Sequence, residues 1–421
     1  MGSNKDDSEE IVRSDSAVFK PGRIGSIVTK NRLVRAATCE HATDGEANDT
    51  LIQIHRKLAQ GGVGMIITGI TWVDPAVKPA HMTRIDNDSF IPGLRKLSRA
   101  VHQEDPNCQI ILQLHHPGRQ VILPGDMPTI LSATPPALVK YIEKHPELLA
   151  EHGDEAPIIH EPVAPSAVYD SFFRRYPRPL SAEEVEHMID AFAEGICRAR
   201  EAGFDGAEIH AAHGWLMSSF LSPHTNKRED IYGGSVANRT RILRDIYAKA
   251  RKKVGPSFPI LVKFNATDFL TDGVDIEECV KIAQILSDTG FDALEISGGM
   301  WEALIRGQED LGFPPLLIPE SRVGIAKPDQ EGYFMSAAKA VKEKTGTTVI
   351  SVGGYRSFSV IEKALESESA DFVSLSRPLV RQPDLPHLWL SGKGADRAAC
   401  ISCSACLTLG NESLNCRAIK K

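Results

Sequence analysis

The chain has 421 residues, of which 42% are hydrophobic and 24% charged, and its formal net charge is −7. This composition is typical of a folded globular protein and is too apolar for a disordered chain. The mild acidity gives no electrostatic reason for a nucleic-acid partner, and no apolar run approaches the ~20 residues of a membrane span. We therefore expect neither nucleic acid nor a membrane among its partners.

The two ends of the chain differ from its middle. Residues 1–17 are polar and acidic, without the apolar or Arg-rich pattern of a targeting signal, which predicts a flexible tail on a cytoplasmic protein. Residues 18–390 form the expected main domain. Four of the eight cysteines crowd into residues 391–421, and an intracellular chain needs no disulfides. The oligomeric state stays open, a homo-oligomer included.

From about residue 30, short apolar runs alternate with longer amphipathic segments. We predict strands at 33–37, 63–69, 109–114, 206–210, 260–265, 293–297, 349–352 and 372–376. Helical patterns lie between most of them, at 181–202 and 276–289 for example, and Ser181 with Glu184 predicts a capping box. Continuous apolar strands suit a parallel sheet covered by helices, so we predict an α/β fold, specifically a (β/α)₈ TIM barrel. A doubly wound sheet is the alternative, but its G-x-G-x-x-G and Walker fingerprints are absent.

A long Pro-rich insertion, residues 121–179, interrupts the alternation after the third predicted strand. It contains a charged helix candidate over 137–150. An insertion at the C-terminal end of a barrel strand would form a lid or a pocket wall, and a surface loop without function is the equal alternative.

Polar residues follow most of the predicted strands, where a barrel places its ligand-binding groups. After the seventh and eighth strands, Gly353, Gly354 and Arg356 precede Ser376 and Arg377 along the chain. Glycines let backbone N–H groups approach an anion, and arginines donate charge-assisted hydrogen bonds. These two loops therefore predict a phosphate site.

Long segments resemble the old yellow enzyme family of FMN-dependent oxidoreductases. The most specific is HAAHGWLMSSFLSPHTNKREDIYGGSVANR at 210–239, and KNRLVRAATCE, ILQLHHPGR, ISVGGYRS and VSLSRPLVRQPDLP occur in the family's order. The resemblance covers residues 18–390 and implies FMN bound non-covalently at the C-terminal mouth of the barrel. It also implies NAD(P)H as the reductant, with the nicotinamide stacked directly on FMN.

The resemblance assigns cofactor contacts residue by residue. Gln113 would bond the pyrimidine edge of the flavin, and Ala37 and Cys39 would lie beside the ring, with Cys39 near O4 and N5. Lys263 stands where the family usually has arginine, so it keeps a cation near N1 and O2 but loses the bidentate fork. A lysine that merely extends its stem from a strand is the alternative. The other predicted cofactor residues are Thr38, Gly69, Ser297, Gly298, Gly353 and Arg356, with Gly354, Ser376 and Arg377 at the phosphate.

His210 and His213 match the pair that hydrogen-bonds the carbonyl or nitro oxygen of the substrate in this family. Two donors on one oxygen would stabilise the enolate-like charge formed on hydride transfer. Zinc ligands or core histidines are the alternatives, although no H-E-x-x-H pattern supports zinc. The predicted catalytic residues are His210, His213, Trp215 and Cys39.

Trp215 departs from the family, which usually has tyrosine here to protonate the substrate α-carbon. An indole N–H donates hydrogen bonds but is no practical acid. Either water or another residue, with Tyr169, Tyr176 and Tyr333 as candidates, supplies the proton, or the reaction is a desaturation, an oxidation or an isomerisation.

The C-terminal cysteines form the pattern C-x-x-C-x-x-C at Cys400, Cys403 and Cys406, followed by Cys416. It resembles the iron–sulfur motif of the 2,4-dienoyl-CoA reductase and trimethylamine dehydrogenase branch. Four thiolates suit a [4Fe–4S] cluster or structural zinc, and unmetallated thiols are the third option. In those relatives the cluster serves FAD/NAD-binding domains, which do not follow here. We therefore expect the motif to be either an evolutionary remnant or a metal site that stabilises residues 391–421.

The sequence thus predicts an FMN-dependent oxidoreductase that passes hydride from NAD(P)H to an activated, enone-like C=C bond of a small molecule. A desaturase, oxidase or isomerase of the same fold is the first alternative. A flavin-binding protein without catalysis, or an electron-transfer subunit, belongs to another class, and the presence of both histidines argues against lost catalysis.

Overall fold

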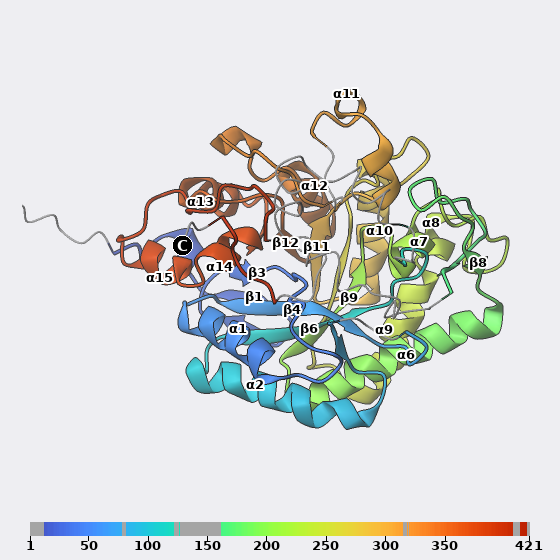
Figure 1. The fold of residues 1–421 in the computed structure, drawn as a ribbon, viewed down its shortest axis with the longest axis horizontal. Helices are drawn as coiled ribbons and strands as arrows, with labels where there is room; N and C mark the ends of the chain where they lie inside the picture. The colour runs from blue at the N-terminus through green and yellow to red at the C-terminus, as the bar shows by residue number, and fades with distance from the viewer. Residues whose placement is uncertain are drawn as a thin grey trace, which may run out of the picture.

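A computed structural model describes residues 12–77, 81–121, 126, 161–314, 318, 320–406 and 413–418. In these residues eight parallel strands close into a barrel (Figure 1). They are β3 (Leu33–Arg35), β4 (Met65–Trp72), β6 (Gln109–His115), β9 (Gly206–Ala211), β10 (Ile260–Asn265), β11 (Ala293–Ser297), β12 (Thr348–Ser351) and β13 (Phe372–Leu375). Because β3 pairs with both β13 and β4, the ring is complete. The predicted (β/α)₈ barrel is confirmed.

Amphipathic helices cover the outside of the barrel. They are α1 (Asp49–Gln60), α2 (Ile91–Glu104), α6 (Ala182–Glu201), α9 (Arg241–Val254), α10 (Ile276–Thr289), α12 (Met335–Thr345) and α13 (Phe358–Glu366). The predicted capping box opens α6, because Ser181 and Glu184 each accept the other's backbone N–H. None of the helices in the described ranges is both long and apolar enough to cross a membrane.

Shorter elements gather in the loops around the strands. These are α7 (Leu216–Leu221), α8 (Val236–Arg239), α11 (Gln308–Leu311), α14 (Arg377–Arg381), α15 (Leu385–Leu390), the small strands β5 (Thr83–Arg84), β7 (Val163–Ala164) and β8 (Arg178–Pro179), and the 3₁₀ helices Ala17–Phe19, Asp88–Phe90, Trp301–Ile305 and Pro328–Gln330. In Figure 1 the C-terminal helices α13 to α15 lie together on one side, next to β3. The charged helix candidate over 137–150 lies outside the described residues.

A hairpin closes the N-terminal end of the barrel. Strands β1 (Gly22–Ile24) and β2 (Ile27–Thr29) pair antiparallel, and Ile24 is fully buried against the barrel lining. A Cβ atom on Gly22 would lie only 2.3 Å from the Phe372 ring, so glycine is needed for this close approach. The apolar plug consists of Ile24, Val34, Met65, Ile67, Ile111, Leu261, Ala293, Ile350 and Phe372.

Candidate active site

Four adjacent strands carry polar side chains toward the C-terminal mouth. Successive side chains of a strand alternate between its two faces, so every second residue faces the interior. Above the apolar plug, the next inward positions are Gln113, Glu208, Lys263 and Glu295, and two residues further along come His115, His210, Asn265 and Ser297. The barrel interior therefore has an apolar level, a charged level and, at the mouth, a level of hydrogen-bonding groups.

The charged level balances two carboxyl groups against one lysine. Lys263 Nζ lies 3.4 Å from Glu295 Oε2, and Gln113 Nε2 donates to Glu208 Oε2 at 2.6 Å. Burial, together with the charge of Glu295, raises the pKa of Glu208 well above its usual value. Burial alone would lower the pKa of Lys263, but Glu295 and Glu208 outweigh it and raise that pKa. The level therefore holds one ion pair, between Lys263 and Glu295, with the Glu208 carboxyl, whose ionisation burial opposes, hydrogen-bonded to Gln113.

His210 and His213 lie together at the end of β9. Their ring centroids are 5.0 Å apart, and both residues are buried. Burial lowers the pKa of each imidazole well below its usual value, so both are neutral at pH 7. The backbone N–H of Ala212 donates to His210 Nδ1 at 3.3 Å, which leaves the proton on Nε2. His210 can thus donate a hydrogen bond into the mouth without carrying a charge.

Several contacts hold His213 in a strained position. Its φ is +63°, a left-handed conformation that non-glycine residues rarely adopt. Its backbone N–H donates to Asn265 Oδ1 at 2.9 Å, and its Nε2 lies 2.7 Å from Ser297 Oγ. Asn265 in turn donates to Asp268 Oδ1 at 2.8 Å. Strain that the surroundings maintain in this way is typical of functional sites.

Aromatic rings surround the histidine pair. The centroid of the His115 ring lies 4.7 Å from the ring centroid of Trp215, 5.1 Å from that of Trp72 and 5.2 Å from that of His210. Trp215 is the residue before α7, and the centroid of its ring lies 6.1 Å from that of Trp301. These rings give the mouth above the histidines an apolar wall suited to a flat substrate.

The three tyrosines considered as proton donors lie elsewhere in the site or on the surface. Tyr169 and Tyr176 contact each other with their rings tilted by 56°, and they are 43% and 69% exposed. Tyr333 donates its hydroxyl to the backbone oxygen of Glu320 at 2.8 Å. The Glu320 carboxyl, whose pKa is raised by burial, lies 3.8 Å from His213 Nδ1. Among the described residues it is therefore a carboxyl, and not a phenol, that comes near the pair.

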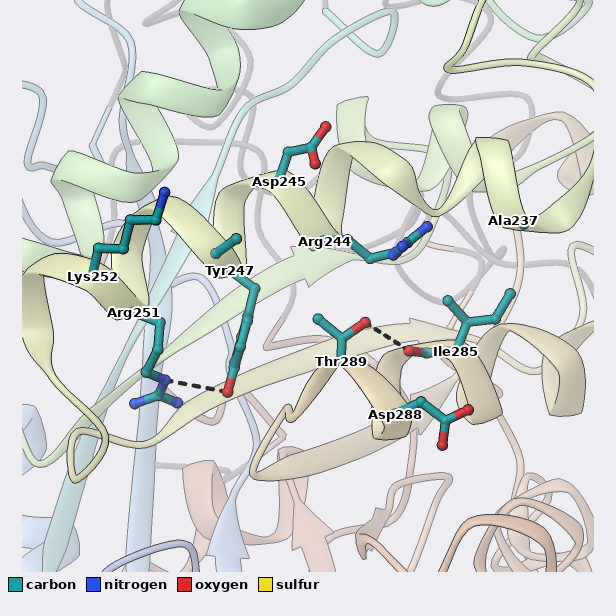
Figure 2. Close-up of a pocket in the computed structure, with 10 residues that line it drawn as sticks. Ala237, Arg244, Asp245, Tyr247, Arg251, Lys252, Ile285, Asp288 and Thr289 are labelled. Carbon is teal, nitrogen blue, oxygen red and sulfur yellow. Dashed lines mark hydrogen bonds between the residues drawn. The ribbon is translucent and has the colours of Figure 1, made fainter.

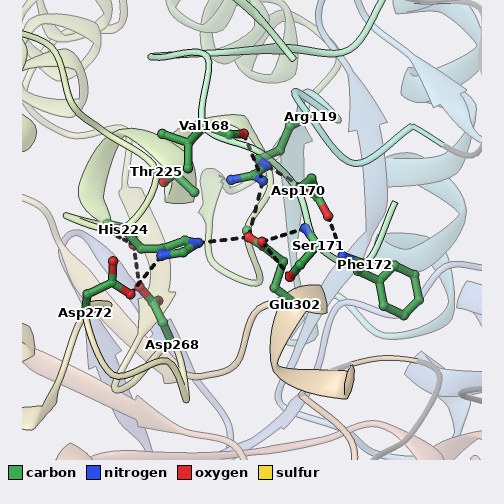
Figure 3. Close-up of polar contacts among 12 residues, drawn as sticks. Arg119, Val168, Asp170, Ser171, Phe172, His224, Thr225, Asp268, Asp272 and Glu302 are labelled. Atoms are coloured by element: carbon green, nitrogen blue, oxygen red, sulfur yellow. Dashed lines mark hydrogen bonds and ion pairs between the residues drawn. The ribbon is translucent and has the colours of Figure 1, made fainter. Parts of the chain in front are cut away.

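A buried polar network fixes the wall that Trp301 belongs to (Figure 3). The carboxylate of Glu302 accepts from the backbone and hydroxyl of Ser171, and it lies 3.3 Å from Arg119 Nη2 and 3.2 Å from His224 Nε2. The hydrogen bond to Glu302 raises the pKa of His224. Loops that follow β6, β9 and β11 are thereby tied together beside the site.

The predicted phosphate loops form a cradle at the ends of β12 and β13. Gly353 and Gly354 have φ values of +134° and +74°, and a Cβ atom on Gly354 would lie 2.5 Å from Ile325. Glycine is needed here because it adopts positive φ values without strain and has no Cβ atom to collide with Ile325. Arg377 is buried nearby at the start of α14. Arg356 instead donates to the backbone oxygen of Ile325, so its guanidinium supports the loop.

The remaining predicted cofactor residues line the mouth between these two ends. Thr38 Oγ1 lies 2.8 Å from Ser376 Oγ, which joins the loops after β3 and β13. Burial raises the pKa of Cys39 to about 12, so its thiol stays protonated as it packs near Trp72. Ala37 packs at the edge of the apolar plug. Added Cβ atoms on Gly69 and Gly298 would lie 2.0 Å from Glu40 Oε2 and 2.7 Å from the Phe334 ring.

The four C-terminal cysteines line one small cavity of about 60 Å³. All are free thiols, Arg381 Nη1 donates to Cys416 Sγ at 3.4 Å, and the backbone N–H of Ser402 donates to Cys400 Sγ at 3.5 Å. Burial raises the pKa of Cys406 to about 11. In the part of the chain that the structure describes, no three His, Cys, Asp or Glu side chains are arranged to hold a metal ion.

A wider groove lies away from the mouth, on the outer helices (Figure 2). It runs between α9 and α10, has a volume of about 670 Å³ and is lined by residues such as Arg244, Tyr247 and Asp288. No predicted site residue borders it.

Sequence reasoning missed Glu208, Glu295, Glu302 and Asn265. Glu208 and Glu295 each interrupt a predicted apolar strand, and a carboxyl group in such a strand is itself a signal, because a buried charge needs a partner. Glu302 and Asn265 gave no comparable signal, since their partners come from distant loops.

A barrel with glycine-rich loops after its seventh and eighth strands has the arrangement in which barrel proteins frequently bind a phosphate group. Residues 17–392 match the NADH:flavin oxidoreductase / NADH oxidase family, and the chain belongs to this family. The predicted resemblance to the old yellow enzymes is confirmed at this level, as is the expectation of an NAD(P)H-dependent flavin oxidoreductase class.

Relatives illustrate the range of this family. The chain is 33% identical over 391 residues to an NADH oxidase of Thermoanaerobacter brockii, with 92% of this chain and 52% of that protein covered. It is 29% identical over 409 residues to a 4,4'-dithiodibutanoate disulfide reductase of Rhodococcus erythropolis, covering 93% and 92%. The structure of a 2-naphthoyl-CoA reductase superposes with a TM-score of 0.77 at 25% identity, covering 95% of this chain and 56% of that one. The chain thus spans about half the length of two of these proteins.

Replacement of Lys263 by methionine should destabilise the protein strongly. Removing one partner of a buried ion pair typically costs about 3–5 kcal/mol of unfolding free energy, because the other charge is left uncompensated. Without the lysine charge, Glu208 would hold its proton still more tightly in the folded than in the unfolded protein, so the loss should grow as the pH rises above the unfolded carboxyl pKa of about 4.3. Chemical denaturation at several pH values measures both effects.

Lys249→Met is the matched control, because Lys249 pairs with Asp190 on the exposed surface. Its effect should stay below about 1 kcal/mol and should not depend on pH in this way. Equal losses in the two variants would contradict the proposed charge balance.

Proposed function

We propose that the protein is an FMN-dependent oxidoreductase that passes hydride from NAD(P)H to an activated C=C bond of a small molecule. The observation that carries this proposal is the neutral, rigidly held pair His210 and His213, one strand away from the buried cation Lys263. Family membership supports the flavin and the nicotinamide cofactor.

The residues present fit FMN. The cradle of Gly353 and Gly354, with buried Arg377, suits a phosphate monoester. Lys263 supplies a cation and Gln113 an amide where the family holds the flavin ring, so these side chains would orient it. When bound, FMN supplies hydride transfer between the nicotinamide and the substrate.

The histidine pair would act on the substrate oxygen. Two neutral imidazole donors fixed before the reaction need no reorganisation as negative charge grows on that oxygen, and a single such donor can contribute about 10²–10³-fold to the rate. The aromatic wall of Trp215, Trp301 and His115 would exclude water from the same place. These side chains thereby bind, orient and polarise the substrate.

Trp215 supports a second candidate, a desaturase, oxidase or isomerase on the same site. An indole cannot protonate the substrate carbon, Tyr169 and Tyr176 are 43% and 69% exposed, and the Tyr333 hydroxyl donates to the backbone oxygen of Glu320. In the reductive case the proton would come from water or from the carboxyl group of Glu320, which lies 3.8 Å from His213 Nδ1.

We further propose that Cys400, Cys403, Cys406 and Cys416 hold a [4Fe–4S] cluster, which requires their thiols to move closer together, because in the described residues they are not arranged around a metal position. The support is that all four free thiols border one cavity, beside Arg377 and Arg381, which would offset thiolate charge. Left-handed residues at Ser402 and Ser404 turn the loop tightly, and close turns present several thiolates to one cluster. Zinc and bare thiols are the competing states.

The purified protein should be yellow with FMN and should oxidise NADPH in the presence of cyclohexenone. The double variant His210→Ala with His213→Ala should keep the flavin but lose enone-dependent turnover and the long-wavelength band that phenols induce, because the donors to the oxygen are gone. Absorbance spectra and steady-state kinetics test both. A colourless protein that FMN cannot reconstitute, or an unchanged band in the double variant, would overturn the proposal.

Trp215→Tyr separates reduction from the second candidate. If alkene reduction is native, the new acid should speed the oxidative half-reaction, within the ~10²–10⁴-fold typical of general acid catalysis, and leave flavin reduction by NAD(P)H unchanged. Trp215→Phe is the control, since it changes the wall without adding an acid. Rapid-reaction kinetics of both half-reactions decide, and a tyrosine variant no faster than the phenylalanine variant would favour the second candidate.

Anaerobically purified protein should contain about four iron and four sulfide per chain, as a [4Fe–4S] cluster requires. Cys403→Ser should lower both together, whereas Cys108→Ser, at a buried cysteine outside the tail, should change neither. Elemental analysis with sulfide determination measures this. One zinc per chain, or four titratable thiols without metal, would contradict the cluster.

A further inference from the structure

Residues 396–404, which include the first two cysteines of the motif, are bonded to both predicted phosphate loops. The backbone N–H of Ala398 donates to the oxygen of Arg356 at 2.7 Å, and that of Phe358 donates to the oxygen of Asp396 at 2.7 Å. Arg377 Nη1 donates to Ser404 Oγ at 2.8 Å. The cysteine-rich tail therefore packs directly behind the cradle.

Ser404 is placed by the shape of the cysteine loop. It is 2% exposed, and its φ is +60°, so it lies in the left-handed region between Cys403 and Cys406. This turn directs its hydroxyl at Arg377. Burial of a hydroxyl is favourable only with a partner, and the guanidinium provides it.

The contact orients Arg377 and leaves other nitrogens of its guanidinium available as donors. Nη1 donates both to Ser404 Oγ and to the backbone oxygen of Arg322, each at 2.8 Å. No hydrogen bond within the described ranges uses Nη2 or Nε. A planar guanidinium held at one nitrogen has its other donors fixed in direction, which is the geometry that phosphate recognition needs.

We propose that Ser404 is a positioning residue for the flavin phosphate: through Arg377, the cysteine-rich tail completes the cofactor site. The inference rests on the proposed function, in which Arg377 binds the phosphate of FMN. It assigns the tail a role in cofactor retention that is independent of electron transfer. Ser404 should affect only the binding of ligands that carry a phosphate monoester. The affinity for riboflavin, which lacks the phosphate, should therefore not depend on Ser404.

The test is the affinity of the flavin-free full chain for FMN and for riboflavin, measured by quenching of flavin fluorescence. Ser404→Ala should weaken FMN binding about tenfold, as expected for partial loss of a charged hydrogen bond, and leave riboflavin binding unchanged. Ser404→Gly should do the same, and because glycine accepts a positive φ without strain, that variant keeps the loop folded.

Ser402→Ala is the matched control. Ser402 is 1% exposed with φ +54° in the same loop, but its link to the cradle region is its backbone oxygen, which accepts from Gly324. It should bind both flavins like the wild type. Equal losses of FMN and riboflavin in the Ser404 variants, or FMN binding like the wild type, would overturn the inference. Arg377→Ala distinguishes failure of this inference from failure of the proposed function. If this variant also binds FMN normally, the assignment of Arg377 to the phosphate is wrong.

Discussion

The ion pair between Lys263 and Glu295, with the buried carboxyl of Glu208 beside it, is the constraint on which the rest of the site depends. The three residues lie on adjacent strands, and each stands two positions before a residue of the mouth: Asn265, Ser297 and His210. A strand cannot shift its inward face by one position without placing a carboxyl or a lysine in the apolar helical layer, where its charge would have no partner. The charged level thus fixes the register that presents the histidines and their supports.

The two ends of the mouth rely on different physical effects. At the fourth strand, burial among aromatic rings keeps His210 and His213 neutral, so they act as donors of fixed direction. At the seventh and eighth strands, we propose that glycine backbone and the Arg377 guanidinium bind the phosphate group. Lys263 lies between the two ends, which suits a long cofactor whose ends differ in charge.

The sequence allowed prediction of the barrel, which is confirmed, and of candidate residues at its mouth, which stay predictions. Parallel strands buried on both faces leave continuous apolar runs, and most predicted boundaries fall within one or two residues. The strand predicted at 63–69 extends as β4 to Trp72, because a register shift between Ile67 and Ile70 carries the pairing past Gly69. The resemblance supplied His210, His213 and the phosphate loops. It could not supply the partners of Glu302 or Ser404, because these contacts join loops from different strands and depend on the stagger of the closed barrel.

The hairpin β1–β2 lies at the end of the barrel where mutations are expected to affect stability and not catalysis. Its Ile24 and Gly22 close the end of the barrel opposite the mouth, against Phe372, and the charged level separates them from the histidines. Substitutions there act on packing alone, whereas substitutions above the charged level act on chemistry. Stability and specificity can therefore drift separately during evolution, and a library directed at new substrates can vary the mouth while the plug is kept constant.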